Sequence, residues 1–187
     1  LLILYLSLTP TLNLFRSNQM MNASFEPFRI VNTYGAFGHV GKVRREIIIE
    51  GTSNKQVTKK TLWKAYEFKA KPGNPYRISP QISPYHYRLD WQIWFAAMGN
   101  YTQHPWLVHF IYKLLLNDEE ALGLLKDSPF KEEAPQYIRA ILYEYTFTKT
   151  IKQGTWQRKA VDYYLPPLSK DNESLKSFIT QYGWSVK

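Results

Sequence analysis

VRREIIIEG, residues 43–51, is the stretch of sequence that decides the fold. Its three consecutive isoleucines are β-branched, and such side chains fit a pleated strand better than a helix. LWKAYEFKA at 62–70 and YIRAILYEYTFT at 137–148 have the same character, and the polar tract GTSNKQVTKK is typical of a long hairpin loop. We therefore predict antiparallel strands along these three segments.

The remaining segments complete the predicted fold. FRIV at 28–31 is expected to be another strand, and TWQRKAVDYYL at 155–165 a partner strand across a turn at Gly154. Prolines in KPGNPYRISPQISPY, 71–85, predict an ordered crossing loop, because proline cannot donate a backbone hydrogen bond. Apolar residues at helical spacing predict a helical section from about 89 to 126.

The chain ends in SLKSFITQYGW, which predicts a C-terminal helix with Ser169 or Asp171 as its cap. The order of strands, inserted helices, more strands and a last helix predicts an α+β fold. We expect an antiparallel β-sheet or β-sandwich with an inserted helical section and a C-terminal helix.

The first fifteen residues, LLILYLSLTPTLNLF, carry no charge before Arg16. A membrane span needs about 20 apolar residues, so we expect 1–16 to be the end of a transmembrane or hydrophobic segment and 17–187 to be the domain. A buried helix or strand is the alternative for the same run. Because the chain begins with leucine, we interpret it as part of a longer protein.

Composition narrows the classes of function. The net charge is +9, but the basic residues are dispersed and no nucleic-acid-binding motif accompanies them, so no nucleic-acid partner is expected. The chain has no cysteine, which excludes disulfides and thiolate metal sites. Aromatic residues make up 16% of the chain, and their number indicates large contact areas.

Histidine supplies the main candidates for metal binding or general-base catalysis: His39, His86, His104 and His109. His104 and His109 are five residues apart, which does not place both on one helical face, and the chain contains neither HExxH nor GxSxG. We expect no catalytic residue, no metal site and no cofactor.

SPYHYRLDWQIWFAA, residues 83–97, admits two interpretations. The alternation of His86, Arg88 and Asp90 would place them on one side of an extended segment, as in an active site. Alternatively, Asp90 caps a helix, and the aromatic residues that follow, Trp91, Trp94 and Phe95, form an apolar stripe at i, i+3, i+4 spacing. We favour the second interpretation, a structural joint.

Three asparagines, Asn22, Asn100 and Asn172, stand in N-x-Ser/Thr sequons and are candidate N-glycosylation sites. The sequons matter only if the chain enters the secretory lumen.

Several ordered blocks resemble the carboxy-terminal domain of the lipase maturation factor family. They are NASFEPFRIVNTYGAFG, EGT at 50–52, YEFKAKPGNPYR, ISPYHYRLDWQIWFAA, Pro105-Trp106, SPF at 128–130 and YLPPLS, and the similarity runs from about 21 to 184. The resemblance implies a multi-pass membrane protein of the endoplasmic reticulum, with this domain in the lumen. It also implies a chaperone-like, non-catalytic role, with secreted homodimeric lipases as folding clients and attachment to the membrane through the upstream segment.

Under this resemblance, exposed aromatic residues are expected to hold a partly folded lipase, with Tyr34, Phe37 and Trp106 as candidate client contacts. A competing hypothesis is a carbohydrate-binding β-sandwich module that stacks sugars on Trp63 and Tyr66. An enzymatic alternative requires His86, Asp90 and His104 to converge in one pocket.

Overall fold

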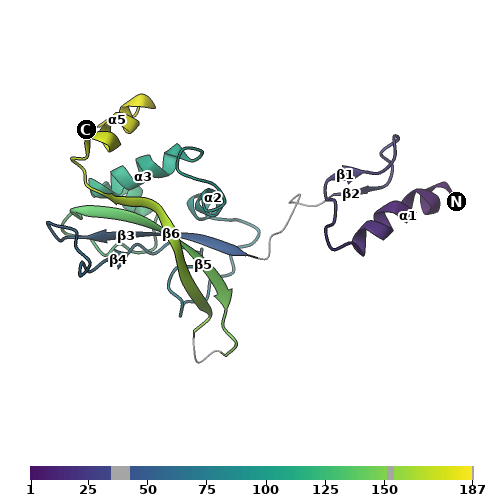
Figure 1. The fold of residues 1–187 in the computed structure, drawn as a ribbon, viewed down its shortest axis with the longest axis horizontal. Helices are drawn as coiled ribbons and strands as arrows, with labels where there is room; N and C mark the ends of the chain where they lie inside the picture. Colours follow the sequence, from purple (N-terminus) through teal and green to yellow (C-terminus); the bar gives the residue numbers. More distant parts are fainter. Residues whose placement is uncertain (35–42, 151–153, 187) are drawn as a thin grey trace. The chain divides into compact units, whose positions relative to one another are not determined.

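The computed structural model describes residues 1–34, 43–150 and 154–186, and the chain forms two compact units, Leu1–Lys42 and Val43–Lys187 (Figure 1). Antiparallel sheets, inserted helices and a C-terminal helix confirm the predicted α+β class. The predicted client contact Phe37 lies outside the described residues.

The first unit contains helix α1, Leu2–Leu14, and a two-stranded antiparallel sheet of β1, Ala23–Ser24, and β2, Asn32–Thr33. The side chain of Asn13 is buried and joins the helix to the following loop by exchanging two 2.9 Å hydrogen bonds with the backbone of Met20. Within the described ranges, no helix is both long and apolar enough to cross a membrane.

The predicted strand at 28–31 is wrong. The carboxylate of Glu26 accepts hydrogen bonds from the backbone N–H groups of Phe28, Ile30 and Val31, and Arg29 has a φ of 54°. A side chain that satisfies these donors locally removes the need for a partner strand. The chain therefore turns around Glu26, and the strands on either side of this turn, β1 and β2, pair with each other.

The second unit is built on a four-stranded antiparallel sheet with the order β4-β3-β5-β6. Its strands are β3, Arg44–Thr52, β4, Lys64–Ala65, β5, Tyr137–Phe147, and β6, Trp156–Leu168. The strands predicted at 43–51, 137–148 and 155–165 are confirmed. The strand predicted at 62–70 is wrong beyond Ala65: Tyr66 still donates its N–H to the carbonyl of Ile49 in β3 at 2.9 Å, but Glu67 then forms an isolated bridge with Asp127, outside this sheet.

Helices α2, Arg88–Ala96, α3, Pro105–Leu115, and α4, Glu119–Gly123, all lie between β4 and β5 in the chain, which confirms the inserted helical section. Helix α5, Glu173–Gln181, is the predicted C-terminal helix. Its predicted caps, Ser169 and Asp171, are wrong: Asn172 Oδ1 accepts the N–H of Leu175 at 2.9 Å.

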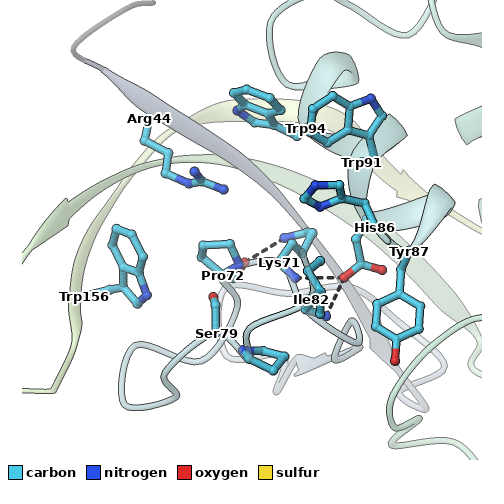
Figure 2. A pocket seen from close by; sticks show the side chains of 13 residues that line it. Arg44, Lys71, Pro72, Ser79, Ile82, His86, Tyr87, Trp91, Trp94 and Trp156 are labelled. Carbon is cyan, nitrogen blue, oxygen red and sulfur yellow. Dashed lines mark hydrogen bonds between the residues drawn. The ribbon is translucent and has the colours of Figure 1, made fainter. Parts of the chain in front are cut away.

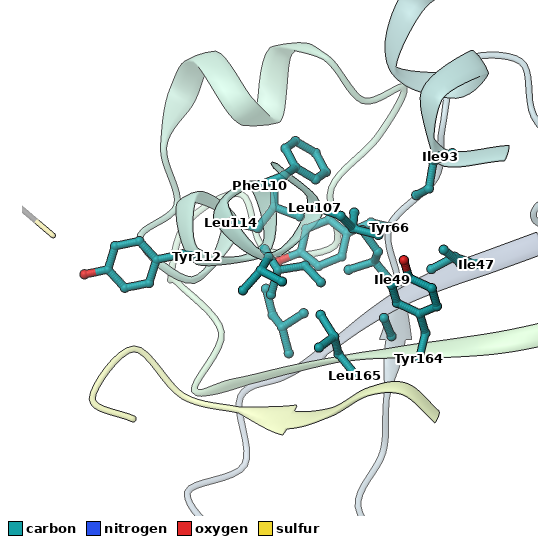
Figure 3. Packing of buried hydrophobic residues seen from close by; sticks show 14 of the residues in the cluster. Ile47, Ile49, Tyr66, Ile93, Leu107, Phe110, Tyr112, Leu114, Tyr164 and Leu165 are labelled. Carbon is teal, nitrogen blue, oxygen red and sulfur yellow. The ribbon is translucent and has the colours of Figure 1, made fainter. Parts of the chain in front are cut away.

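The main core lies between one face of this sheet and the inserted helices (Figure 3). Ile47 and Ile49 of β3 point into it, together with Leu107 and Leu114 of α3, and all four are fully buried. Alternate residues of a strand share a face, so one face of β3 meets the helices and the other does not. The unit thus has one sheet covered by helices, the first of the two predicted architectures.

The proline-rich segment 71–85, predicted to be an ordered crossing loop, contacts part of the opposite face of the sheet. The hydroxyl of Tyr145 donates to the carbonyl of Gly73 at 2.6 Å, and the backbone N–H of Trp156 donates to the carbonyl of Pro75 at 3.0 Å. Tyr145 and Trp156 also pack with Ile48 in a second, smaller hydrophobic cluster. The loop is therefore held to the first residues of β6 and to the last residues of β5.

Alkaline pH is expected to destabilise this face. Burial raises the pKa of Tyr145 to about 12. Because this folded-state pKa lies above the ordinary value of about 10, the neutral phenol stabilises the fold fully below pH 10, and its contribution is lost as the pH rises toward 12. We expect Tyr145→Phe to lower the free energy of unfolding by about 1 kcal/mol at pH 7 and to weaken its decline above pH 10, measured by urea unfolding.

The exposed Tyr85 supplies the matched control, since Tyr85→Phe should leave the pH profile unchanged. Burial also raises the pKa of Tyr164 to about 12, so part of the alkaline decline should remain in Tyr145→Phe. An identical decline in the wild-type and Tyr145→Phe proteins would contradict the assignment.

Candidate functional site

Asp90 is the joint between helix α2 and the segment that leaves the sheet. It is 5% exposed, and its Oδ1 accepts the backbone N–H groups of Ala70 at 2.6 Å and Lys71 at 2.8 Å. The favoured interpretation, a structural joint, is confirmed for this residue. Its predicted role as a helix cap is wrong, because α2 begins at Arg88 and Asp90 lies within the first turn.

A pocket of about 320 Å³ lies beside this joint, between α2, the proline-rich loop and the first residues of β3 and β6 (Figure 2). Five aromatic side chains contribute to its wall: His86, Tyr87, Trp91, Trp94 and Trp156. Four of them, all except Trp156, come from the stretch 83–97. The stretch therefore provides both a joint and a concave surface.

Paired charges lie in and beneath the pocket. Glu46 is fully buried and accepts from Arg44 at 2.8 and 2.7 Å, while Lys71 Nζ lies 3.2 Å from its other oxygen. The Arg44 guanidinium also lies over the rings of Trp94 and Trp156, 5.7 and 5.9 Å from their centroids. With Asp90 included, two cations and two anions balance, so the pocket has no net formal charge.

The outer face of α2 exposes a row of large apolar side chains. Tyr87, Trp91, Phe95 and Met98 follow one another at spacings of four, four and three residues and are 46, 37, 36 and 59% exposed. We call these four residues the α2 stripe. The rings of Trp91 and Phe95 meet edge to face at 5.4 Å, so the stripe is continuous at its centre.

The predicted stripe of Trp91, Trp94 and Phe95 has the expected spacing, but the core is on the other side of the helix. Ile93 and Ala96 are the residues that α2 buries against the sheet. With these two residues turned to the core, Trp91 and Phe95 lie on another side of the helix and stay partly in solvent. This outward aromatic face is the feature that the sequence analysis missed.

The other predicted contacts are in different places. Tyr34 is 68% exposed in the first unit, whereas Trp106 in the first turn of α3 is half-buried and packs against the main core. His104 precedes α3 and does not line the pocket that His86 and Asp90 share. The enzymatic set is thus not assembled, and the described part of the chain has no cluster of three His, Asp or Glu side chains suited to a metal.

The sugar-stacking surface predicted on Trp63 and Tyr66 does not form. Tyr66 is 2% exposed, with its ring 5.6 Å from that of Phe130 in the core. The ring of Trp63 lies 4.2 Å from the guanidinium of Arg139, which Glu50 holds at 2.7 Å. Tyr66 therefore cannot stack on a sugar, and Arg139 already packs on Trp63.

The three sequon asparagines differ in accessibility. Asn22 and Asn100 are exposed, and Asn100 Oδ1 accepts the backbone N–H of Thr102 at 3.0 Å. Asn172 is half-buried and caps α5 through Oδ1. A glycan attaches at Nδ2, so this cap hydrogen bond is compatible with modification.

Comparison with a family model and comparison with known proteins point to the same family. A family model described as the lipase maturation factor C-terminal domain matches residues 30–166. Mouse lipase maturation factor 1 is 46% identical over all of this chain and 33% of its own length, and the human protein is 42% identical over 99% of the chain and 34% of its own length. Chicken lipase maturation factor 2 is 34% identical over 91% of the chain and 24% of its own length.

The chain thus spans about a third of the length of the first of these relatives. No solved structure matches it.

Proposed function

This chain belongs to the lipase maturation factor family, and we therefore propose that it helps secreted homodimeric lipases to fold and assemble into active dimers. In this proposal it acts as a non-catalytic, chaperone-like domain in the lumen of the endoplasmic reticulum. Its partners are lipase subunits that have not yet buried their apolar surface. No cofactor takes part.

The observation that carries the proposal is the α2 stripe. Contiguous exposed apolar surface is uncommon on soluble domains and marks sites of interaction. Incompletely folded chains expose apolar side chains and unpaired strand edges, which aggregate unless they are covered. A row of Tyr87, Trp91, Phe95 and Met98 can cover such surface, and methionine and aromatic side chains adapt to partners of varied shape.

Tyr34, Phe37 and Trp106 remain proposed as further client contacts. The exposure of Tyr34 supports a contact through its ring. Trp106 is half-buried against the core, so any contact it makes involves only the outer edge of the indole.

We also propose that residues 1–16 end a hydrophobic segment of a longer membrane protein and that 17–187 lie in the lumen. Helix α1 carries no charged side chain, and most of its apolar side chains are exposed: Leu2, Ile3, Leu4, Leu8 and Leu12. Its 13 residues rise about 20 Å, less than the roughly 30 Å of a bilayer core. The accessible sequons at Asn22 and Asn100 suit a lumenal location, and a net charge of +9 does not prevent a large domain from being translocated.

Deleting residues 22–187 from the full-length protein tests the proposal. In cells that lack their own maturation factor, we expect the intact protein to restore secreted lipase activity. The deletion should leave activity near that of unrescued cells, because the client-binding surface is gone. The measurement is lipase activity in the medium, with immunoblots showing that the truncated protein remains in the membrane fraction. Full restoration by the truncated protein would overturn the proposed function.

A further inference from the structure

Three polar atoms in the wall of the α2 pocket have no hydrogen-bond partner among the described residues: Trp156 Nε1, Ser79 Oγ and Asp90 Oδ2. Trp156 is only 7% exposed and Asp90 only 5%. Buried polar groups in folded proteins are nearly always hydrogen-bonded, and an unsatisfied one is costly. Figure 2 shows the indole of Trp156 and the hydroxyl of Ser79 turned toward the cavity. Their convergence on one cavity indicates a binding site.

The types of these atoms restrict the ligand. An indole N–H only donates, a carboxylate oxygen only accepts, and a hydroxyl does both. The ligand must therefore accept from Trp156 and donate to Asp90. Arg44 and Lys71 are already paired with Glu46, and the four charges balance, so the pocket does not favour a ligand of either sign. An uncharged group that carries both an N–H and a C=O, such as a peptide unit, meets all of these conditions.

The apolar part of the wall distinguishes a peptide from a sugar. Pro72, Pro80 and Ile82 line the cavity, and the α2 stripe continues from it through Trp91 to Phe95. Aliphatic side chains and methionine offer little to a sugar, whose hydroxyl groups need polar partners. Aromatic-lined grooves that meet a few hydrogen-bonding groups are a recurring way to bind extended peptide chains.

We infer that this pocket binds an extended, uncharged and hydrophobic peptide segment, whose backbone groups pair with Trp156 and Asp90 while its side chains pack on the aromatic wall. Only the origin of that segment, a partly folded lipase, rests on the proposed function. The binding chemistry rests on the pocket itself. The α2 stripe would then hold the neighbouring residues of the same segment.

Trp156→Phe tests the inference, because it keeps an aromatic ring at this position and removes the indole N–H together with the five-membered ring that carries it. The probe is the neutral peptide GSLILSG, amidated at its C-terminus and labelled at its N-terminus with the uncharged fluorophore BODIPY, titrated with the purified 187-residue chain and followed by anisotropy. We expect Trp156→Phe to bind it about five- to tenfold more weakly than wild type, the effect of one lost hydrogen bond. Ser79→Ala should weaken binding in the same direction.

Trp63→Phe is the matched control, because Trp63 is half-buried but does not line the pocket. The Trp63→Phe variant should bind the peptide with the affinity of wild type. Thermal unfolding of each variant separates lost binding from lost folding. Glu- and Lys-containing versions of the peptide should bind more weakly than the neutral one.

Three results would overturn the inference: no binding of the neutral peptide, equal affinity of wild type and Trp156→Phe, or displacement of the peptide by mannotriose at a lower concentration than by unlabelled peptide. The last result would assign the pocket to sugars. The lipase deletion experiment is independent of all three. The chain could bind the peptide through Trp156 while deletion of residues 22–187 leaves lipase activity intact. That pair of results would refute the lipase function and keep the peptide site.

Discussion

Asp90→Ala is expected to lower the free energy of unfolding by about 3 kcal/mol. The carboxylate accepts two backbone N–H groups, from Ala70 and Lys71, at a position that is 95% buried. Alanine would leave both donors without a partner where water does not easily reach them. Equilibrium urea unfolding, followed by tryptophan fluorescence, measures the change. Asp90→Asn keeps one acceptor oxygen and should lose less than half as much stability.

Asp171→Ala is the control for this prediction. Asp171 has a largely exposed side chain and pairs only loosely with Lys176, at 3.8 Å. Its replacement should change stability by no more than about 0.5 kcal/mol. If Asp90→Ala unfolded at the same urea concentration as wild type, the joint would not be supporting the fold.

The second large effect is expected on client binding. The double substitution Trp91→Gln with Phe95→Gln removes the two rings at the centre of the α2 stripe and keeps good helix formers in α2. Central aromatic side chains dominate most interfaces, and losing one typically costs 2 kcal/mol or more. We expect the amount of newly synthesised lipase that co-precipitates with the full-length protein to fall several-fold. Pulse-labelling followed by precipitation under mild detergent measures it.

Phe28→Gln controls for the general loss of an exposed aromatic ring. Phe28 lies in the first unit, is 76% exposed and belongs to neither the stripe nor the pocket. Lipase should co-precipitate with this variant as with wild type. A thermal unfolding midpoint of the stripe variant far below that of wild type would show instead that Trp91 and Phe95 act as core residues.

The long strands could be predicted from sequence because burial and pairing coincide there. Ile47, Ile48 and Ile49 are buried on both faces of β3, and their β-branched side chains favour that backbone. In residues 62–70, by contrast, side chains are buried where the backbone is not paired in the sheet. Tyr66 and Phe68 alternate and are buried, yet the last backbone hydrogen bond to β3 comes from Tyr66, and Phe68 has no partner strand among the described residues. Alternation reports which side chains are buried and does not show whether the backbone has a partner.

The α2 stripe and the pocket beside it were harder to predict. Helical spacing correctly grouped Trp91 and Phe95, but α2 also carries Ile93 and Ala96 on another side. Size and hydrophobicity favoured burial of the aromatic side, whereas close packing against β3 required the smaller residues. The pocket joins Asp90 to Trp156, from a helix and a distant strand, so only the folded chain brings these groups together.

The most direct test of the account is the activity per unit mass of lipase secreted by cells that lack their own maturation factor. These cells receive the full-length protein with either the wild-type α2 stripe or the Trp91→Gln, Phe95→Gln substitution, at equal abundance. The account predicts that the substituted protein yields secreted lipase of much lower activity per unit mass, because subunits leave without assembling correctly. Equal activity per unit mass in the two cell lines would contradict it.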